Sequence, residues 1–286
     1  MTTVFRLTSM KRAALLIGAC ASLFCLYGCG IGMRFVFSSD QRVVATPDQR
    51  GLVYRDVHFP SRDGVRLHGW LVPGEAGKPL VLFFHGDAAN ISDRVDNLAY
   101  LHRMGLTVFI FDYRGFGSSQ GEPTSEEDLD QDARGAIAYL EGRGWSPDDM
   151  IYFGRSMGAA VALQMAIETP PAGVILESPF TTLRAIARQT APVSYALFGW
   201  WNIGKVFDNL DKVGKVKVPL LIFYGDKDRI VPEKMPLSLF ARARQPKTLY
   251  LVRGAGHSNA FEVGGNGYRQ AWYSFLVRIA KARAAL

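Results

Sequence analysis

The residue best suited to chemistry is Ser156, in the motif Gly154-Arg155-Ser156-Met157-Gly158. The apolar run Met150 to Phe153 before it predicts a buried strand, and the apolar run Ala159 to Ile167 after it predicts a buried helix. Glycines two positions before and after the serine permit a sharp turn, because larger side chains would collide there. The turn would hold the hydroxyl at a helix N-terminus, where developing negative charge is stabilised. We therefore expect Ser156 to be a nucleophile.

A second copy of the pattern lies at Gly117-Ser118-Ser119-Gln120-Gly121. It runs into Glu122-Pro123 and an acidic stretch, and no apolar helix begins at its second glycine. A short motif is only as strong as its structural surroundings. The surroundings favour Ser156 over Ser119.

A serine hydroxyl is a weak nucleophile that needs a base, and the base needs an orienting acid. Of the five histidines, His257 has the most suitable position, in the glycine-rich loop Gly254 to Asn259 between the final predicted strand and the final helix. The other four lie within predicted elements or directly after a strand: His58, His68, His85 and His102. We expect His257 to be the base.

The acid is expected between Ser156 and His257, because serine, acid and histidine follow one another in this order in sheets of this kind. The loop Tyr224 to Pro232 follows an apolar strand and offers two aspartates. Asp228 lies deeper in the loop and is favoured, whereas Asp226 is suited to capping the turn. Glu177, after the preceding strand, is the alternative. These residues all follow predicted strands, beyond whose carboxyl ends ligands bind in open α/β sheets.

A tetrahedral intermediate also needs two N–H donors for its oxyanion. One is expected from the backbone of Met157, directly after the nucleophile. The other is expected from the backbone of Asp87, in the loop after the apolar strand 79–84. His85 and Gly86 would then support the turn; the alternative is that they form an ordinary strand exit.

The elements that must position these residues follow from the hydrophobic pattern. Residues 53–59 and 65–72 alternate apolar and polar side chains and predict a β-hairpin. Apolar strands are expected at 79–84, 106–111, 150–153, 173–176, 219–224 and 248–252, separated by helices. This alternation predicts an α/β fold with a mostly parallel central sheet and helices on both faces.

Residues 180–217 are too long for a simple crossover and predict a lid. The segment combines large aromatic side chains with an excess of Lys and Arg. Apolar rings beside cations suit a surface that meets lipid head groups and admits an acyl chain. Phe198, Trp200 and Trp201 are therefore candidates for a substrate pocket; the alternative is that they fill the core of the lid itself.

The first residues have the pattern of a secretory signal, with Lys11-Arg12 before the apolar run 13–26. Leu26-Tyr27-Gly28-Cys29 resembles a bacterial lipoprotein cleavage box, so we expect residues 1–28 to be removed and Cys29 to be lipidated. Ile17-Gly18-Ala19-Cys20 fits the same pattern after a shorter apolar run, and an uncleaved membrane anchor through Phe37 is the alternative. Residues 29–51 would then be an anchor and linker, and 52–286 the folded domain. The protein is expected to be exported and membrane-anchored, at the periplasmic face or the cell surface.

The charge distribution and the cysteine content exclude several kinds of partner and site. The net charge of +7 is not arranged as a basic stripe interleaved with stacking aromatics, so nucleic-acid binding is not expected. No cysteine follows Cys29, which excludes a disulfide within the domain and a cysteine-bound zinc. The oligomeric state is not indicated.

Six motifs in order resemble those of α/β-hydrolase-fold serine hydrolases, in the branch of small membrane-associated acyl and lipid hydrolases. They are His85-Gly86-Asp87-Ala88-Ala89-Asn90, Asp112-Tyr113-Arg114-Gly115-Phe116-Gly117, Gly154 to Gly158, Glu177-Ser178-Pro179-Phe180-Thr181, Gly225 to Pro232 and Gly256-His257-Ser258-Asn259. By position, the resemblance implies Ser156 as nucleophile, Asp228 as acid and His257 as base, with the amides of Met157 and Asp87 as oxyanion hole. Asp87 stands where the branch often has asparagine, and Ser258 separates His257 from Asn259.

The resemblance implies hydrolysis of carboxylic esters or thioesters through an acyl-enzyme on Ser156, without a metal or cofactor. The substrate would be a small acyl ester or an acylated molecule. One alternative is a serine peptidase, which would need a site for a free amine or chain end. The other is a non-catalytic scaffold that binds a partner or lipid, which the complete set of triad residues disfavours.

Overall fold

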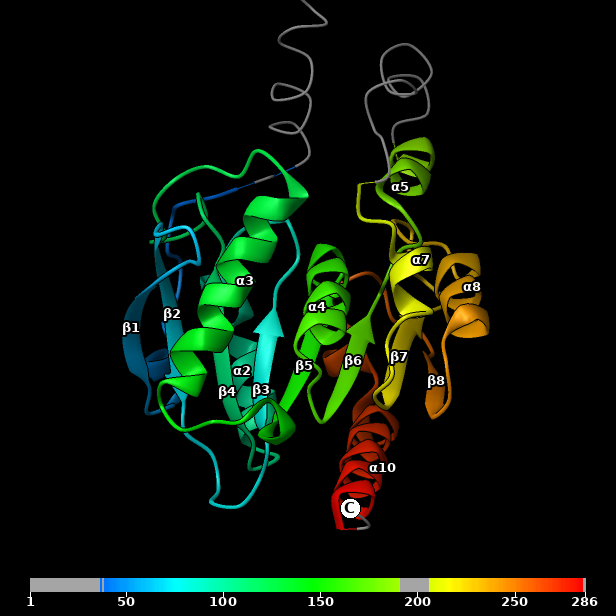
Figure 1. Ribbon diagram of the computed structural model, residues 1–286. Helices are drawn as coiled ribbons and strands as arrows, with labels where there is room; N and C mark the ends of the chain where they lie inside the picture. Colours follow the sequence, from blue (N-terminus) through cyan, green and yellow to red (C-terminus); the bar gives the residue numbers. More distant parts are fainter. Residues whose placement is uncertain (1–36, 38, 191–205, 285–286) are drawn as a thin grey trace, which may run out of the picture.

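The computed structural model describes residues 37, 39–190 and 206–284, and its centre is one eight-stranded sheet (Figure 1). The strands are β1 (Arg55–Pro60), β2 (Arg66–Val72), β3 (Leu80–Phe84), β4 (Thr107–Asp112), β5 (Met150–Arg155), β6 (Gly173–Glu177), β7 (Leu220–Gly225) and β8 (Lys247–Val252). Their spatial order is β1-β2-β4-β3-β5-β6-β7-β8. β1 and β2 pair antiparallel, as do β2 and β4, and all other neighbours are parallel. The predicted hairpin and the mostly parallel α/β sheet are confirmed.

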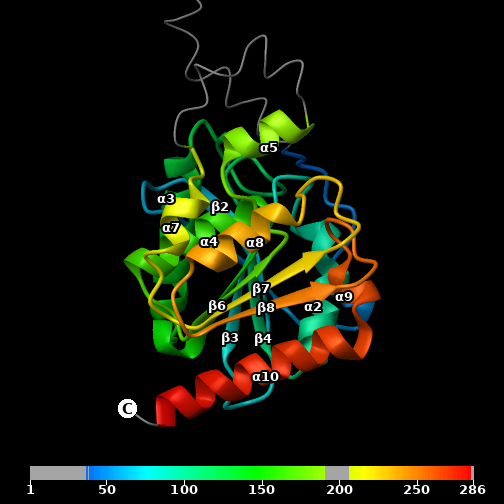
Figure 2. The ribbon, with the colours of Figure 1, turned by 90° about the vertical axis from the view of Figure 1, so that its right-hand side faces the viewer.

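Helices cover both faces of the sheet (Figure 2). One face packs against α3 (Glu126–Glu141), α4 (Met157–Glu168), α7 (Asn209–Val213) and α8 (Lys234–Arg242). The other packs against α2 (Val95–His102), α9 (Ala260–Val263) and α10 (Gly265–Ala284). Short 3₁₀ helices η1 (Pro47–Arg50), η2 (Ile91–Arg94) and η3 (Pro147–Asp149) lie in the connections.

The continuous apolar strands are explained by this two-sided burial. In β3, the side chains of Leu80, Leu82 and Phe84 join the core under α3 and α4. Val81 and Phe83 point the other way and join the core under α2 and α10. Burial of each such side chain stabilises the fold by about 1.5–3 kcal/mol. The layers therefore fix the strand ends from which the candidate site residues emerge.

The predicted lid is described at its two ends. Helix α5 (Leu183–Thr190) begins it, and α7 closes it against α4 and α8. Lys212 on α7 pairs with Glu126 on α3 at 2.5 Å, and Glu126 also accepts a hydrogen bond from the Phe207 N–H at 2.6 Å. Cys29, Phe198, Trp200 and Trp201 lie outside the described residues. Among the described residues, no helix has the length and hydropathy needed to span a membrane.

Asp130 on α3 makes the stability of the fold depend on pH. Its side chain is buried, and within the described structure its Oδ1 has no hydrogen-bond partner. Burial raises the pKa of Asp130 to about 8, although Lys212 opposes the shift. The folded protein therefore keeps a proton that the unfolded chain loses at lower pH, so this residue's contribution to stability falls as pH rises through that interval.

We expect Asp130→Asn to be more stable than the wild type at pH 8 by roughly 1–3 kcal/mol, because ionisation of the carboxyl favours the unfolded wild type at this pH and asparagine has no such group. At pH 3 the two proteins should be nearly equal, because the aspartate is then largely protonated in both the folded and the unfolded state. Denaturant unfolding at the two pH values measures the difference. Asp148→Asn, at an exposed position, is the matched control. A difference for Asp130→Asn that does not change with pH would contradict this prediction.

Candidate active site

Ser156 occupies the turn that the sequence predicts between β5 and α4. Its backbone lies at φ 52° and ψ −116°, in a region that side chains other than glycine rarely adopt. A Cβ at Gly154 would collide with the Gly158 carbonyl oxygen, and one at Gly158 would collide with the carbonyl oxygen of Phe84. Both glycines are therefore required by the close packing of β3, β5 and α4. The strained turn places Ser156 at the N-terminus of α4.

Ser156, His257 and Asp228 form one continuous chain of hydrogen bonds. Ser156 Oγ lies 2.9 Å from His257 Nε2, and His257 Nδ1 lies 2.8 Å from Asp228 Oδ2. In the tautomer with its proton on Nδ1, His257 donates to Asp228 and accepts from the serine hydroxyl. The structure thus brings together three residues that are separated by up to 101 positions in the sequence.

Asp228 is held as a carboxylate by its surroundings. Burial alone would raise its pKa, but the hydrogen bond from His257 and those from two backbone N–H groups bring the pKa below its ordinary value. The two N–H groups belong to Ile230 and Val231 and donate to Oδ1 at 2.9 and 2.8 Å. They leave Oδ2 for the imidazole and fix its direction.

The other candidate acids have different contacts. Asp226 Oδ1 accepts the Gly254 N–H at 2.6 Å and ties the loop after β7 to the loop after β8. Glu177 is fully buried, and its oxygens contact Arg155 Nε and the Tyr268 hydroxyl, each at 2.7 Å. Asp226 therefore stabilises a turn, as its position suggested, and Glu177 belongs to a buried ion pair.

The Arg155–Glu177 ion pair supports the turn that carries Ser156. This support was not predicted from the sequence. Arg155 is buried and also donates to Asn97 Oδ1 on α2 at 3.1 Å, while its guanidinium lies over the Phe83 ring. The Ser156 N–H donates to the Glu177 carbonyl oxygen at 3.0 Å. Arg155 occupies a variable position of the motif, so no sequence signal identified its role.

Ser178 is a second residue that the sequence reading missed. Its hydroxyl donates to the backbone carbonyl of His257 at 3.1 Å, and its φ is 49°. It joins the end of β6 to the loop that carries the base. The available signal was its position in Glu177-Ser178-Pro179-Phe180-Thr181, one of the six motifs on which the resemblance to serine hydrolases is based.

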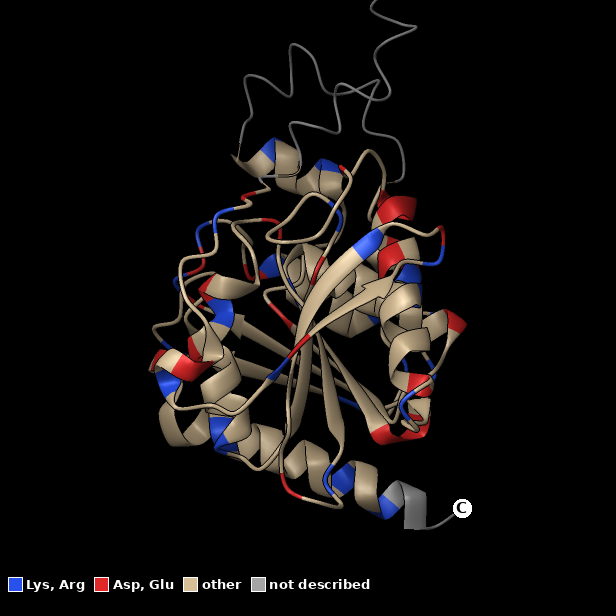
Figure 3. Cartoon of the chain, turned by 90° about the vertical axis from the view of Figure 1, so that its left-hand side faces the viewer, with Lys and Arg blue, Asp and Glu red and all other residues tan. Residues whose placement is uncertain are grey.

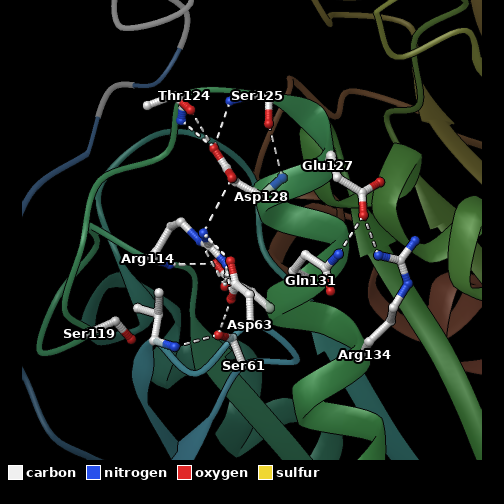
Figure 4. Close-up of polar contacts among 12 residues, drawn as sticks. Ser61, Asp63, Arg114, Ser119, Thr124, Ser125, Glu127, Asp128, Gln131 and Arg134 are labelled. Carbon is white, nitrogen blue, oxygen red and sulfur yellow. Dashed lines mark hydrogen bonds and ion pairs between the residues drawn. The ribbon is translucent and has the colours of Figure 1, made fainter.

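The second G-x-S-x-G motif lies beside the polar network around Arg114, whose bonds are drawn in Figure 4. Ser119 is buried; its hydroxyl donates to the Asp112 carbonyl at 2.7 Å and accepts the His68 N–H at 2.9 Å. Nearby, the Arg114 guanidinium donates to Asp63 and Asp132 at 2.7–2.9 Å. These bonds hold the loop after β4 to the hairpin and to α3, and they leave Ser119 bonded to backbone groups rather than to a histidine ring.

The predicted oxyanion donors flank the nucleophile. Met157 is the first residue of α4, and Asp87 lies in the loop after β3; both line the same pocket as Ser156 and His257. The loop packs closely on the nucleophile, since a Cβ at Gly86 would lie 3.4 Å from that of Ser156. The Asp87 carboxyl also borders this pocket; burial raises its pKa, while proximity to His257 opposes the shift. The hydrogen-bonding role of the two amides stays a prediction.

The pocket in front of Ser156 has a volume of about 430 Å³. Away from Ser156 and His257, the pocket wall is largely apolar. It is formed by the two described ends of the lid and by the loop after β7. The apolar lining residues are Phe180, Leu183, Ile186, Ala187, Phe207 and Ile230. A reactive polar group at one end and an apolar wall at the other suit a substrate that combines a carbonyl with a hydrocarbon portion.

Known proteins share both the sequence and the fold. Residues 75–210 match the family profile described as serine aminopeptidase, S33. An uncharacterized protein of Mycobacterium tuberculosis is 33% identical, over 95% of this chain and 98% of its own length. The α/β hydrolase domain-containing protein WAV2 of Arabidopsis thaliana is 30% identical, over 82% of each chain. A solved esterase of Pyrococcus furiosus has a TM-score of 0.71 and 22% identity, over 85% of this chain and 97% of its own, which shows the common fold. The chain belongs to the α/β-hydrolase family.

Proposed function

We propose that this protein is a serine hydrolase that cleaves carboxylic esters or thioesters. The observation that carries the proposal is the hydrogen-bonded chain Ser156–His257–Asp228 at the floor of an apolar pocket. Each member is held by further bonds from separate elements, so the arrangement is built before a substrate binds. Such preorganisation is what nucleophilic catalysis requires.

In the proposed reaction, Ser156 Oγ attacks the acyl carbon while His257 Nε2 takes the hydroxyl proton. Asp228 keeps the imidazole oriented and stabilises its positive charge. The Met157 and Asp87 amides donate to the carbonyl oxygen as it becomes an oxyanion. His257 then returns the proton to the departing alcohol or thiol, which leaves an acyl-enzyme. Water, activated by the same imidazole, attacks the acyl group and releases the acid and free Ser156.

The pocket favours an ester or thioester over a peptide with a free amine. An aminopeptidase, the activity named in the matching family profile, needs a carboxylate for the substrate's ammonium group. Among the described residues that line the pocket, Asp87 is the only acid, and burial raises its pKa. A carboxyl group that is harder to ionise is a weaker partner for an ammonium group. Peptide cleavage is therefore the second candidate.

Two assays test the proposal directly. A fluorophosphonate probe should label the wild type at Ser156, with the modified peptide identified by mass spectrometry. Turnover should then be measured on a series of acyl esters and thioesters and, in parallel, on aminoacyl nitroanilides. Faster cleavage of the nitroanilides would move the assignment to a peptidase, and absence of both labelling and turnover would support a binding scaffold.

The apolar wall should set the acyl-chain preference. Ile186→Ala removes part of the wall on α5 and should lower kcat/KM for medium-chain esters, with little change for acetyl esters. Each methylene that loses its apolar contact costs about 0.8 kcal/mol, or roughly fourfold. The double replacement of Trp200 and Trp201 by alanine tests the predicted lid pocket in the same way. A uniform loss across chain lengths, with a lower melting temperature, would assign the replaced residues to packing alone.

We further propose that the protein is exported and tethered to a membrane by lipid on Cys29. Support comes from the basic residues, apolar run and cleavage box of residues 11–29. Cys29→Ser should leave an unprocessed precursor without labelled fatty acid, whereas Cys20→Ser should be processed and labelled like the wild type. Equal labelling of the two variants would contradict lipidation at Cys29.

A further inference from the structure

The described residues that follow the proposed anchor are hydrogen-bonded to the loops after β3 and β4. Residues 39–44, here called the strap, contact the loop that carries Asp87. Ser39 pairs with Ala89 in a parallel bridge, and the buried Asn90 side chain donates to the carbonyl oxygens of Asp40 and Arg42, each at 2.9 Å. The Gly117 N–H also donates to the Asp40 carbonyl at 2.9 Å. The strap is thus fixed to the loop that carries Asp87.

Phe37, just before the strap, contacts a side chain of the pocket wall. Its side chain is buried and packs edge-on against Phe207, with ring centroids 6.5 Å apart. Phe207 packs in turn against Phe180 at 6.3 Å, and these two rings line the pocket in front of Ser156. Phe37 therefore packs behind a ring of the pocket wall, and the N-terminal segment meets the domain next to the candidate site.

The length of the tether restricts how the domain can face a membrane. Eight residue steps separate Cys29 from Phe37, and they span at most about 26–29 Å when fully extended. A compact domain of about 250 residues is roughly 45 Å across. The end of the sheet opposite the pocket therefore cannot rest on the bilayer while Cys29 is anchored in it. An uncleaved anchor that ends nearer to Phe37 would impose the same restriction more tightly.

The charges on α5 suit a lipid surface, although Figure 3 also shows acidic residues of the first turn of α3 toward this end. Helix α5 contains Arg184 and Arg188 and no acidic residue, and it lies at the same end of the molecule as the strand ends that carry the site (Figures 1 and 3). Arg229 and Ile230 are exposed in the loop after β7, and Ile230 lines the pocket. Cations beside exposed apolar side chains are the combination that binds anionic lipid head groups.

We propose that the anchor holds the pocket mouth against the lipid surface, and that the substrates are acyl esters or thioesters presented by that same membrane. This inference rests on the proposed hydrolase activity and tether, and it adds an orientation and a source of substrate. The apolar wall would receive an acyl chain that rises only a short way out of the bilayer. The strap would connect the anchor directly to the loop that carries Asp87, so that the two keep a fixed position relative to each other.

Orientation can be measured in the full chain without any turnover. The domain has no cysteine after Cys29, so single cysteines can be labelled in a Cys20→Ser, Cys25→Ser background that also carries Ser156→Ala. We choose Gln189→Cys at the exposed end of α5 and Val277→Cys on α10, which lies toward the opposite end of the molecule (Figure 2). The protein is reconstituted in vesicles of phosphatidylcholine and phosphatidylglycerol with a head-group quencher. The label at residue 189 should be quenched several-fold more than that at residue 277; equal quenching would overturn the inference.

Kinetics test the source of substrate. In the lipidated enzyme, Arg188→Glu should lower hydrolysis of an ester held in the same vesicles about tenfold or more, because each basic residue near an anionic surface contributes about 1 kcal/mol and reversal doubles the change. Hydrolysis of a soluble short-chain ester should not change. Arg143→Glu makes the same charge change at an exposed position near the other ends of the strands and should affect neither substrate.

The outcomes separate this inference from the function on which it rests. If the soluble ester is not cleaved, the proposed hydrolase activity fails, while the quenching still reports orientation. If the soluble ester is cleaved but Arg188→Glu and Arg143→Glu behave alike on the vesicle ester, the membrane-facing pocket is wrong and the hydrolase proposal stands.

Discussion

Replacing Ser156 by alanine is expected to lower kcat by a factor on the order of 10⁶, the usual cost of losing a triad nucleophile. The change removes only Oγ, the atom that lies 2.9 Å from His257 Nε2. Alanine lacks both the attacking atom and the proton that the imidazole would accept. Initial rates on the best ester, together with loss of fluorophosphonate labelling, measure the effect. The fold should remain, although the turn at φ 52° stays strained.

Ser119→Ala is the matched control, because Ser119 is the middle residue of the other G-x-S-x-G motif. Its hydroxyl joins the Asp112 carbonyl to the His68 N–H in a buried position. Removing it should lower the free energy of unfolding by about 1–3 kcal/mol, since buried partners lose their bonds. The kcat of the folded enzyme should change little. An inactive Ser119→Ala beside an active Ser156→Ala would overturn the assignment of the nucleophile.

The fold was predictable because its main determinant is local. Apolar runs such as Leu80 to Phe84 are buried on both sides, which is typical of a parallel sheet covered by helices on both faces. The hairpin was predictable from alternation along Arg66 to Val72 and from the turn before it. The strand order could not be read from these patterns, because nothing local requires β3 to lie between β4 and β5.

The candidate site was predictable where a backbone constraint leaves a signature. Gly154 and Gly158 are needed because β3 and α4 leave no space for a side chain. The supporting contacts left no such signature. Arg155 reaches Asn97 across 58 positions, and Asn90 reaches Asp40 across 50. These polar side chains resemble ordinary surface residues until folding brings their partners beside them. The same holds for Asp130, whose raised pKa is a product of burial.

The predictions for Cys29, Phe198, Trp200 and Trp201 stay predictions, because these residues lie outside the described structure. The structure shows where the segments that contain these residues join the domain. Phe37 and residues 39–44 fix where the N-terminal segment meets the domain, and α5 and α7 fix where the lid leaves it and returns. Both connections lie at the pocket. The anchor, the lid and the nucleophile are therefore expected to act at one face.

The orienting acid gives the second large effect. Asp228→Asn should lower kcat by roughly 10⁴, because an amide NH₂ facing Nδ1 selects the wrong imidazole tautomer. The protein should stay folded, since Oδ1 of the asparagine can still accept the Ile230 and Val231 N–H groups. Asp226→Asn should cost much less activity, because Asp226 bonds the Gly254 N–H instead of the imidazole.

Glu177→Gln separates catalysis from support. The substitution leaves the buried Arg155 without its carboxylate, and breaking a buried ion pair costs about 3–5 kcal/mol of stability. Its kcat, measured well below the melting temperature and corrected for the folded fraction, should stay far above that of Asp228→Asn. Steady-state rates and denaturant unfolding on the same samples distinguish the two effects. If Glu177→Gln were as inactive as Ser156→Ala while fully folded, and Asp228→Asn nearly normal, the acid would have to be Glu177. The 2.8 Å bond between His257 and Asp228 predicts the opposite ranking: a stable, inactive Asp228→Asn and an unstable, active Glu177→Gln.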